Sequence, residues 1–296
     1  MFALHRRKAW QGAQIEASAW NFDIAGITYV GQTSLTLASS GTQQHLVFHQ
    51  FVDDGTSFIY SSQYASYKLS LPVPYSIISS NLIPVATVGN LVGSSTYRGQ
   101  FSGDGRNLYL YTATSGVNNF KRLQLDVPYD IFSKSNSDVI SITPSRPVTD
   151  GQDGYFSADG LKFYTFPCNG TQAELHQYGL SEPFDASTLS LAMTSVSLWA
   201  LAGGVSNSTG FSHFAISPDG FRIISAGGTY ASSSGLRLRM WYLQVPWDIS
   251  RISHLGTINL DSHQAESIDY VFVDPTATYL YVASGRNIFQ YAIPQS

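Results

Sequence analysis

Four ionisable residues occupy the same relative position in four successive segments of the chain: Arg98, Asp153, His213 and Asp269. In a fifth segment, His49 directly follows the residue at this position. Two carboxylates held near each other could act as the paired acids of glycoside hydrolysis, or with a histidine they could hold a hard cation. An arginine beside them could bind an anionic sugar through two parallel hydrogen bonds. Whether these side chains meet depends on the elements that carry them.

A repeated turn signal sets the positions of these residues. Asp-Gly recurs at intervals of 50, 55 and 60 residues, and each copy separates two short runs rich in apolar and aromatic residues. Asp-Gly between such runs is a strong signal for a β-hairpin, because both residues tolerate a positive φ. The copies are Asp54-Gly55, Asp104-Gly105, Asp159-Gly160 and Asp219-Gly220, with a degenerate fifth copy at Asp274-Pro275-Thr276.

A second signal, a proline followed by an aromatic residue, ends a third apolar run after each hairpin. Proline cannot donate a hydrogen bond to a β-ladder, so it should end the strand. We expect the aromatic ring to pack between neighbouring units and the aspartate that usually follows to turn the chain into a fourth run. The pairs stand in Pro74-Tyr75-Ser76-Ile77, Pro128-Tyr129-Asp130-Ile131, Pro183-Phe184-Asp185 and Pro246-Trp247-Asp248-Ile249.

Four strands in each of five repeats predict an all-β chain, a five-bladed β-propeller of four-stranded antiparallel blades. The last repeat stops after its third strand, so we expect a strand at about 26–38 to join this C-terminal blade and close the ring, which removes both sheet edges. The propeller would then occupy residues 21–296, and residues 1–20 would form an N-terminal arm that could serve as an anchor. Two sandwich domains are the alternative, which a repeat that runs unbroken to the C-terminus disfavours.

The composition limits the partners of this propeller. Charged residues make up 12% of the chain, about half the usual share of ~25%, and the formal net charge is −4. We therefore expect no nucleic acid, which would require a basic stripe, and a polar, weakly charged surface suited to neutral partners such as glycans. No apolar run approaches the ~20 residues of a membrane helix, and the first residues lack the apolar stretch of a secretory signal.

The repeat resembles those of propellers in bacteriophage tails and other virion-associated proteins. The likeness is best in the fourth copy, with Ser217-Pro218-Asp219-Gly220 and Pro246-Trp247-Asp248-Ile249-Ser250, and it covers about residues 21–296. The resemblance implies a virion protein, made in the host cytoplasm, that attaches to a host surface or to other virion proteins. The arm would contact those other virion proteins; a bacterial surface glycan as ligand and a homo-oligomer are left open.

In a propeller the equivalent positions that carry the four ionisable residues would form a ring at one mouth of the central channel, with His49 beside the fifth position. Arg98, Asp153, His213, Asp269 and His49 are therefore the candidate ligand-binding residues, although compensating charges at a wet channel mouth would be stable without a ligand. We assign no catalytic residue, no metal site and no cofactor. The leading interpretation is a non-enzymatic structural and binding protein of a virion. The alternatives are a carbohydrate-active enzyme of the glycosidase type and a soluble lectin.

Overall fold

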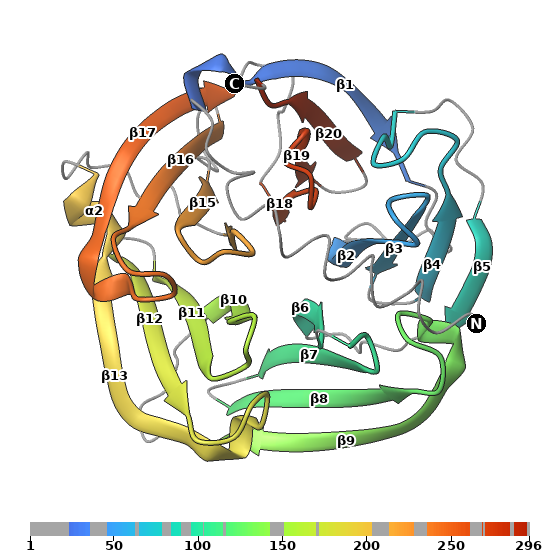
Figure 1. Ribbon diagram of the computed structural model, residues 1–296, viewed down its shortest axis with the longest axis horizontal. Helices are drawn as coiled ribbons and strands as arrows, with labels where there is room; N and C mark the ends of the chain where they lie inside the picture. Colours follow the sequence, from blue (N-terminus) through green and yellow to red (C-terminus); the bar gives the residue numbers. More distant parts are fainter. Residues whose placement is uncertain are drawn as a thin grey trace.

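The computed structural model is a ring of five antiparallel sheets, and each sheet has four strands (Figure 1). This confirms the five-bladed propeller expected from the repeats and rules out the pair of sandwich domains. The predicted boundary at residue 20 lies outside the described residues and stays a prediction. The structure describes residues 24–35, 46–62, 65–78, 84–89, 96–102, 104–114, 117–142, 151–169, 172–202, 213–227, 236–260, 268, 270–284 and 287–294.

Within each blade the chain runs from the innermost strand outward. Blade 1 contains β2 (Leu46–Val52), β3 (Ser57–Ser62), β4 (Ala65–Ser70) and β5 (Pro84–Gly89), and blade 2 contains β6 (Thr96–Phe101), β7 (Asn107–Thr114), β8 (Val117–Leu125) and β9 (Lys134–Ile142). Blade 3 contains β10 (Gly151–Phe156), β11 (Lys162–Asn169), β12 (Gln172–Leu180) and β13 (Leu189–Ser197), and blade 4 contains β14 (His213–Ile216), β15 (Arg222–Gly227), β16 (Leu236–Leu243) and β17 (Ile252–Leu260). Blade 5 contains β18 (Tyr270–Val273), β19 (Tyr279–Ser284), β20 (Asn287–Ala292) and, from the other end of the chain, β1 (Thr28–Ser34).

In the part of the chain that the structure describes, the helical elements are single turns. Among the described residues the one α-helix is α2, with four residues, and no helix there is long and apolar enough to cross a membrane. Three of the 3₁₀ turns directly follow the proline-aromatic pairs, and each begins at an aspartate whose side chain accepts a backbone N–H two residues later. The elements are η1 (Ile24–Gly26), η2 (Ile131–Ser133), η3 (Ala186–Thr188), α2 (Leu198–Leu201) and η4 (Ile249–Arg251).

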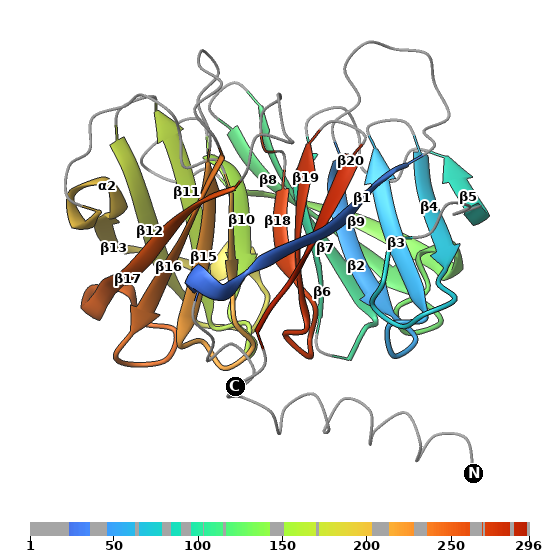
Figure 2. The ribbon, with the colours of Figure 1, turned by 90° about the horizontal axis from the view of Figure 1, so that it is seen from above.

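The N-terminal strand closes the ring as the sequence predicted. β1 pairs antiparallel with β20, from Thr28 opposite Ala292 to Ser34 opposite Asn287, and it crosses the outside of blade 5 (Figure 2). The Ser34 hydroxyl donates to Oδ1 of Asn287 at 2.6 Å. Because the two ends of the chain share one sheet, β1 covers the edge of β20 that would otherwise be open to another strand.

The hairpins and the proline-aromatic corners of the first four blades are bonded to each other. In each of these blades the backbone N–H of the corner aromatic donates to the carbonyl of the hairpin glycine at 2.8–2.9 Å. The ring lies where a side chain on that glycine would be, and both residues have a positive φ. The two repeated sequence signals therefore form one structural unit at one edge of each blade. The pairs are Gly55 with Tyr75, Gly105 with Tyr129, Gly160 with Phe184, and Gly220 with Trp247.

Two of the corner aromatics also stack on the preceding blade, as expected. The Phe184 ring stacks on Tyr109 of blade 2 with centroids 5.5 Å apart, and Trp247 stacks on Tyr155 of blade 3 at 6.5 Å. The corner residues also form hydrogen bonds across the junctions between blades 3 and 4 and between blades 5 and 1. Between blades 3 and 4, the Tyr164 hydroxyl donates to the Trp247 carbonyl at 2.5 Å, and Oε1 of Gln177 accepts the Ile249 N–H at 3.0 Å. Between blades 5 and 1, the Tyr281 hydroxyl donates to the Tyr75 carbonyl, and Oε1 of Gln290 accepts the Ile77 N–H at 3.1 Å.

Candidate functional site

Four members of the expected ring lie in the innermost strands of their blades, whose other ends lead into the hairpin turns. The structure describes the side chains of Arg98 in β6 and His213 in β14. It places His49 and Asp153 in β2 and β10 without describing their side chains, and Asp269 lies outside the described residues. The predicted ring can therefore be followed at two of its members.

Arg98 reaches across the axis of the propeller. Its Nη1 donates to the backbone carbonyl of Phe214 at 2.6 Å, and its guanidinium carbon lies 4.8 Å from the ring centroids of both Tyr155 and Tyr270. The residue is 3% exposed. A buried cation is costly unless it is paired or hydrogen-bonded, and here two aromatic faces and a carbonyl dipole provide the compensation. Arg98 thus joins blade 2 to blades 3, 4 and 5 at the centre of the ring.

His213 belongs to the same cluster. It is buried, and its ring centroid lies 6.2 Å from that of Tyr270. Arg98 and His213 therefore contact the same aromatic ring, which makes Tyr270 the centre of the described part of the cluster. The described contacts of the guanidinium are made with the protein itself, so the binding of an anionic sugar by Arg98 stays a prediction.

A second polar cluster, which sequence reasoning missed, lies on the outer strands of blade 3. Oε2 of Glu174 lies 3.0 Å from Nε2 of His176 and accepts a hydrogen bond from the Ser195 hydroxyl at 3.2 Å. The hydrogen bond from His176 holds the pKa of Glu174 below its ordinary value. The carboxylate stands between the hydroxyl and the imidazole, whereas an activated serine requires a direct contact with its base. The cluster can therefore fix these two strands, but its geometry does not activate Ser195.

Metal binding finds no support in the part of the chain that the structure describes. No group of three or more His, Cys, Asp or Glu side chains gathers there in a way that could hold an ion. The carboxylates Asp153 and Asp269, which a cation site at the channel mouth would use, lie outside this statement because their side chains are not described.

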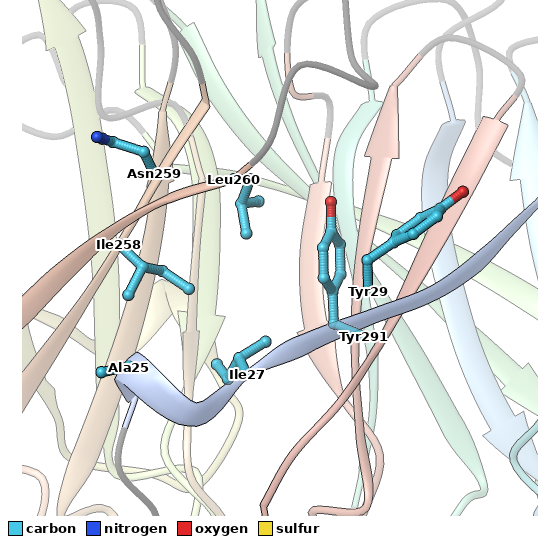
Figure 3. Close-up of a pocket in the computed structure, with 7 residues that line it drawn as sticks. All are labelled: Ala25, Ile27, Tyr29, Ile258, Asn259, Leu260 and Tyr291. Carbon is cyan, nitrogen blue, oxygen red and sulfur yellow. The ribbon is translucent and has the colours of Figure 1, made fainter.

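A third site is a pocket of about 380 Å³ at the seam where the two chain ends meet. It lies between the outermost strand of blade 4, β17, and the pair β1 and β20 of blade 5 (Figure 3). The ring centroids of Tyr29 and Tyr291 are 5.6 Å apart and meet edge to face. Sequence reasoning missed this pocket, although the predicted pairing of the N-terminal strand with the last blade would have brought both tyrosines to one place.

The fold places the chain in the class of five-bladed β-propellers with a closing strand from the N-terminus. No protein-family model matches the sequence, and no curated protein matches it. Among solved structures it is similar to a functionally unknown protein from Desulfotomaculum acetoxidans DSM 771, with 13% identity over 87% of this chain and 72% of that chain, and a TM-score of 0.40. A likeness this distant carries no argument about function.

Proposed function

We propose that this propeller is a non-enzymatic attachment module of a virion, which binds a host surface or another virion protein. The observation that carries the proposal is the position of Arg98. Its guanidinium lies 4.8 Å from the ring centroids of Tyr155 and Tyr270 and donates to the carbonyl of Phe214. A catalytic site at this level would need an open space in which polar groups face a substrate. The described centre of the ring is instead packed with protein groups.

The connections between strands support binding at the opposite edge from the hairpins. The hairpins and corners are tight turns closed by backbone hydrogen bonds. The segments 203–212 and 228–235, which join strands at the other edge, are longer and rich in Gly, Ser, Thr or Asn. Binding residues occur disproportionately in loops that a rigid scaffold holds. The low fraction of charged residues suits a neutral polar partner, such as a surface glycan, better than an ionic one.

The assignment to a virion rests on the resemblance of the Asp-Gly and Pro-Trp-Asp-Ile-Ser repeats to those of virion propellers. The experiment is to incubate the purified full chain with a panel of whole bacterial cells and their extracted surface polysaccharides. Sedimentation measures binding, and release of reducing sugar measures cleavage. The wild-type protein should bind cells of at least one strain saturably and release no sugar.

The matched variant is Asp153→Asn with Asp269→Asn, which removes both candidate carboxylates of the channel mouth. It should bind as the wild type does, because the proposal assigns attachment to the segments 203–212 and 228–235 and not to these carboxylates. If the wild type releases sugar and the double variant does not, the protein is a glycosidase and the proposal is overturned. Failure to bind any cell, any polysaccharide or any partner in purified particles would overturn attachment as the function.

A further inference from the structure

The pocket at the seam between blades 4 and 5 is lined by aliphatic and aromatic side chains together with Asn259. Its sides come from three strands that lie far apart in the sequence, β1, β17 and β20. Figure 3 shows Ile258 and Leu260 on one side and the rings of Tyr291 and Tyr29 on the other, with Ile27 between them. The Asn259 side chain is turned away from the tyrosines in this view. The side chains of the lining are thus aliphatic on one side and aromatic on the other, while the surface that is open to a ligand is mostly polar.

The two tyrosines make the pocket amphipathic. Tyr29 is 40% exposed, whereas Tyr291 is buried in the junction. Both rings extend away from β1 toward the same side in the view of Figure 3, with their hydroxyl groups at the far ends. A tyrosine in this setting offers an apolar face and a polar tip. No residue of the lining carries a charged side chain, so nothing in the pocket would compensate a phosphate, a carboxylate or an ammonium group.

We propose that this seam pocket binds a single neutral sugar ring of a glycan. A pyranose has the complementary surface, because its C–H groups can pack on aromatic and aliphatic side chains while its hydroxyl groups bond to hydroxyls at the rim. The volume of about 380 Å³ lies in the range of small-ligand sites, roughly 300–1,000 Å³. The proposal specifies the glycan-binding form of the function proposed above, and it depends on that function only for the source of the glycan.

The sequences of the outer strands explain why one chain would carry one such site. The outermost strands of blades 1 to 4, which are β5, β9, β13 and β17, contain no Phe, Tyr or Trp, whereas β1 contributes Tyr29. Among the outermost strands of the five blades, β1 is thus the one that brings an aromatic ring, and Tyr29 adds this ring to the seam between blades 4 and 5. A lectin with a repeated site in every blade would need an aromatic residue in each outermost strand.

The test is a titration of the full-length protein with a panel of neutral monosaccharides, followed by ligand-observed NMR. The same panel includes uronic acids and sugar phosphates as charged competitors. At least one neutral sugar should bind, and the charged sugars should bind more weakly. The substitution Tyr29→Ser should weaken binding by about tenfold, which is the loss expected when a stacking aromatic ring is removed.

Val30→Ser is the matched control, because Val30 is the next residue of the same strand, is 47% exposed and does not line the pocket. It should leave sugar binding unchanged. Tyr29→Phe keeps the ring and removes only the hydroxyl, so it should fold even if the serine variant does not, and we expect a loss of about threefold for one hydrogen bond. Thermal unfolding of each variant shows whether the fold is intact.

Three results would overturn the proposal: no binding by any neutral sugar of the panel, binding that Tyr29→Ser and Tyr29→Phe leave unchanged, or binding that appears only after deletion of residues 1–20. The last would mean that the chain itself fills the pocket. If no neutral sugar binds but the protein still attaches to cells, the pocket is overturned and the attachment function stands. Sugar binding in the pocket without any cell attachment would overturn the attachment function but leave the pocket standing.

Discussion

The backbone N–H of Trp247 donates to the carbonyl of Gly220 at 2.9 Å, and the indole lies over the position that a side chain on Gly220 would occupy. Gly220 has a φ of +75° and Trp247 a φ of +60°. The hairpin turn and the proline-aromatic corner are therefore fixed by one contact. Because this contact recurs in the first four blades, it explains why the two sequence signals occur together in them.

Gly220→Ala should destabilise the protein by about 2–4 kcal/mol, from a strained positive φ and from overpacking. A Cβ at this position would lie 2.3 Å from the indole ring. Urea unfolding measures the loss. Gly179→Ala in β12 is the control, since no atom lies within 4 Å of a Cβ there, and it should change the free energy of unfolding by less than about 1 kcal/mol. Equal effects of the two substitutions would show that the stacking contact is unimportant.

Arg98→Ala should cost about 3 kcal/mol of stability, because it leaves a cavity between Tyr155 and Tyr270 and removes the donor to the Phe214 carbonyl. The loss should be the same at low and high salt, since a residue 3% exposed is poorly screened. Arg106→Ala, an exposed arginine in blade 2, is the control and should be nearly neutral. A salt-dependent loss for Arg98→Ala would indicate that Arg98 acts as an exposed charge.

The central cluster marks the limit of what the sequence could predict. Arg98 and Phe214 are separated by 116 residues, and alignment of the repeats placed Arg98 on the axis but could not give the direction of its side chain. The partner is a backbone carbonyl, which has no signature in the sequence. The stacking of Tyr155 and Tyr270 on the guanidinium depends in the same way on the side-chain directions of three blades.

The blades themselves were predictable because their turns depend on local chemistry. The hairpin turn needs a residue with a positive φ, which the glycine of Asp-Gly provides, and proline ends a strand. Both the turns and the strand ends can therefore be predicted from short segments of sequence. The fifth hairpin was the degenerate copy, and the structure gives the reason. Ala277, with a φ of 51°, takes the place of the glycine. The buried carboxylate of Asp274 accepts hydrogen bonds from the turn residue Thr276 and from Tyr279, where the hairpins of blades 2, 3 and 4 use a Ser-Asp pair.

Asp248→Ala should lower stability by about 1 kcal/mol near neutral pH, because Asp248 caps the turn η4 by accepting the Ser250 N–H at 2.9 Å. Hydrogen bonds from the side chain and backbone of Ser250 hold the pKa of Asp248 below its ordinary value. The stabilisation is therefore present above the pKa of an unfolded Asp and is lost as the pH falls through the lower folded pKa.

The stability curves of the wild type and Asp248→Ala should thus converge in acid, as measured by urea unfolding over a pH series. Asp248→Asn is the control, since its amide oxygen can still accept the Ser250 N–H but does not titrate. Its stability relative to the wild type should rise as the pH falls. A constant difference between wild type and Asp248→Ala at all pH values would contradict the role of the ionised carboxylate.

Two truncations separate the predicted arm from the closing strand. Removal of residues 1–20 should leave the fold intact, with a Tm within about 2 °C of the full chain, but should abolish incorporation into particles if the arm is the anchor. Removal of residues 1–35 also deletes β1 and its bond from Ser34 to Asn287, and it uncovers the edge of β20. An exposed edge strand pairs readily with another chain, so this truncation should lower the Tm by about 10 °C or more and should form dimers or aggregates in analytical ultracentrifugation.

If the shorter truncation unfolds the protein, the arm is part of the propeller; if it still enters particles, the anchor lies elsewhere. A monomeric, fully stable protein without residues 1–35 would show that β1 does not hold the ring closed.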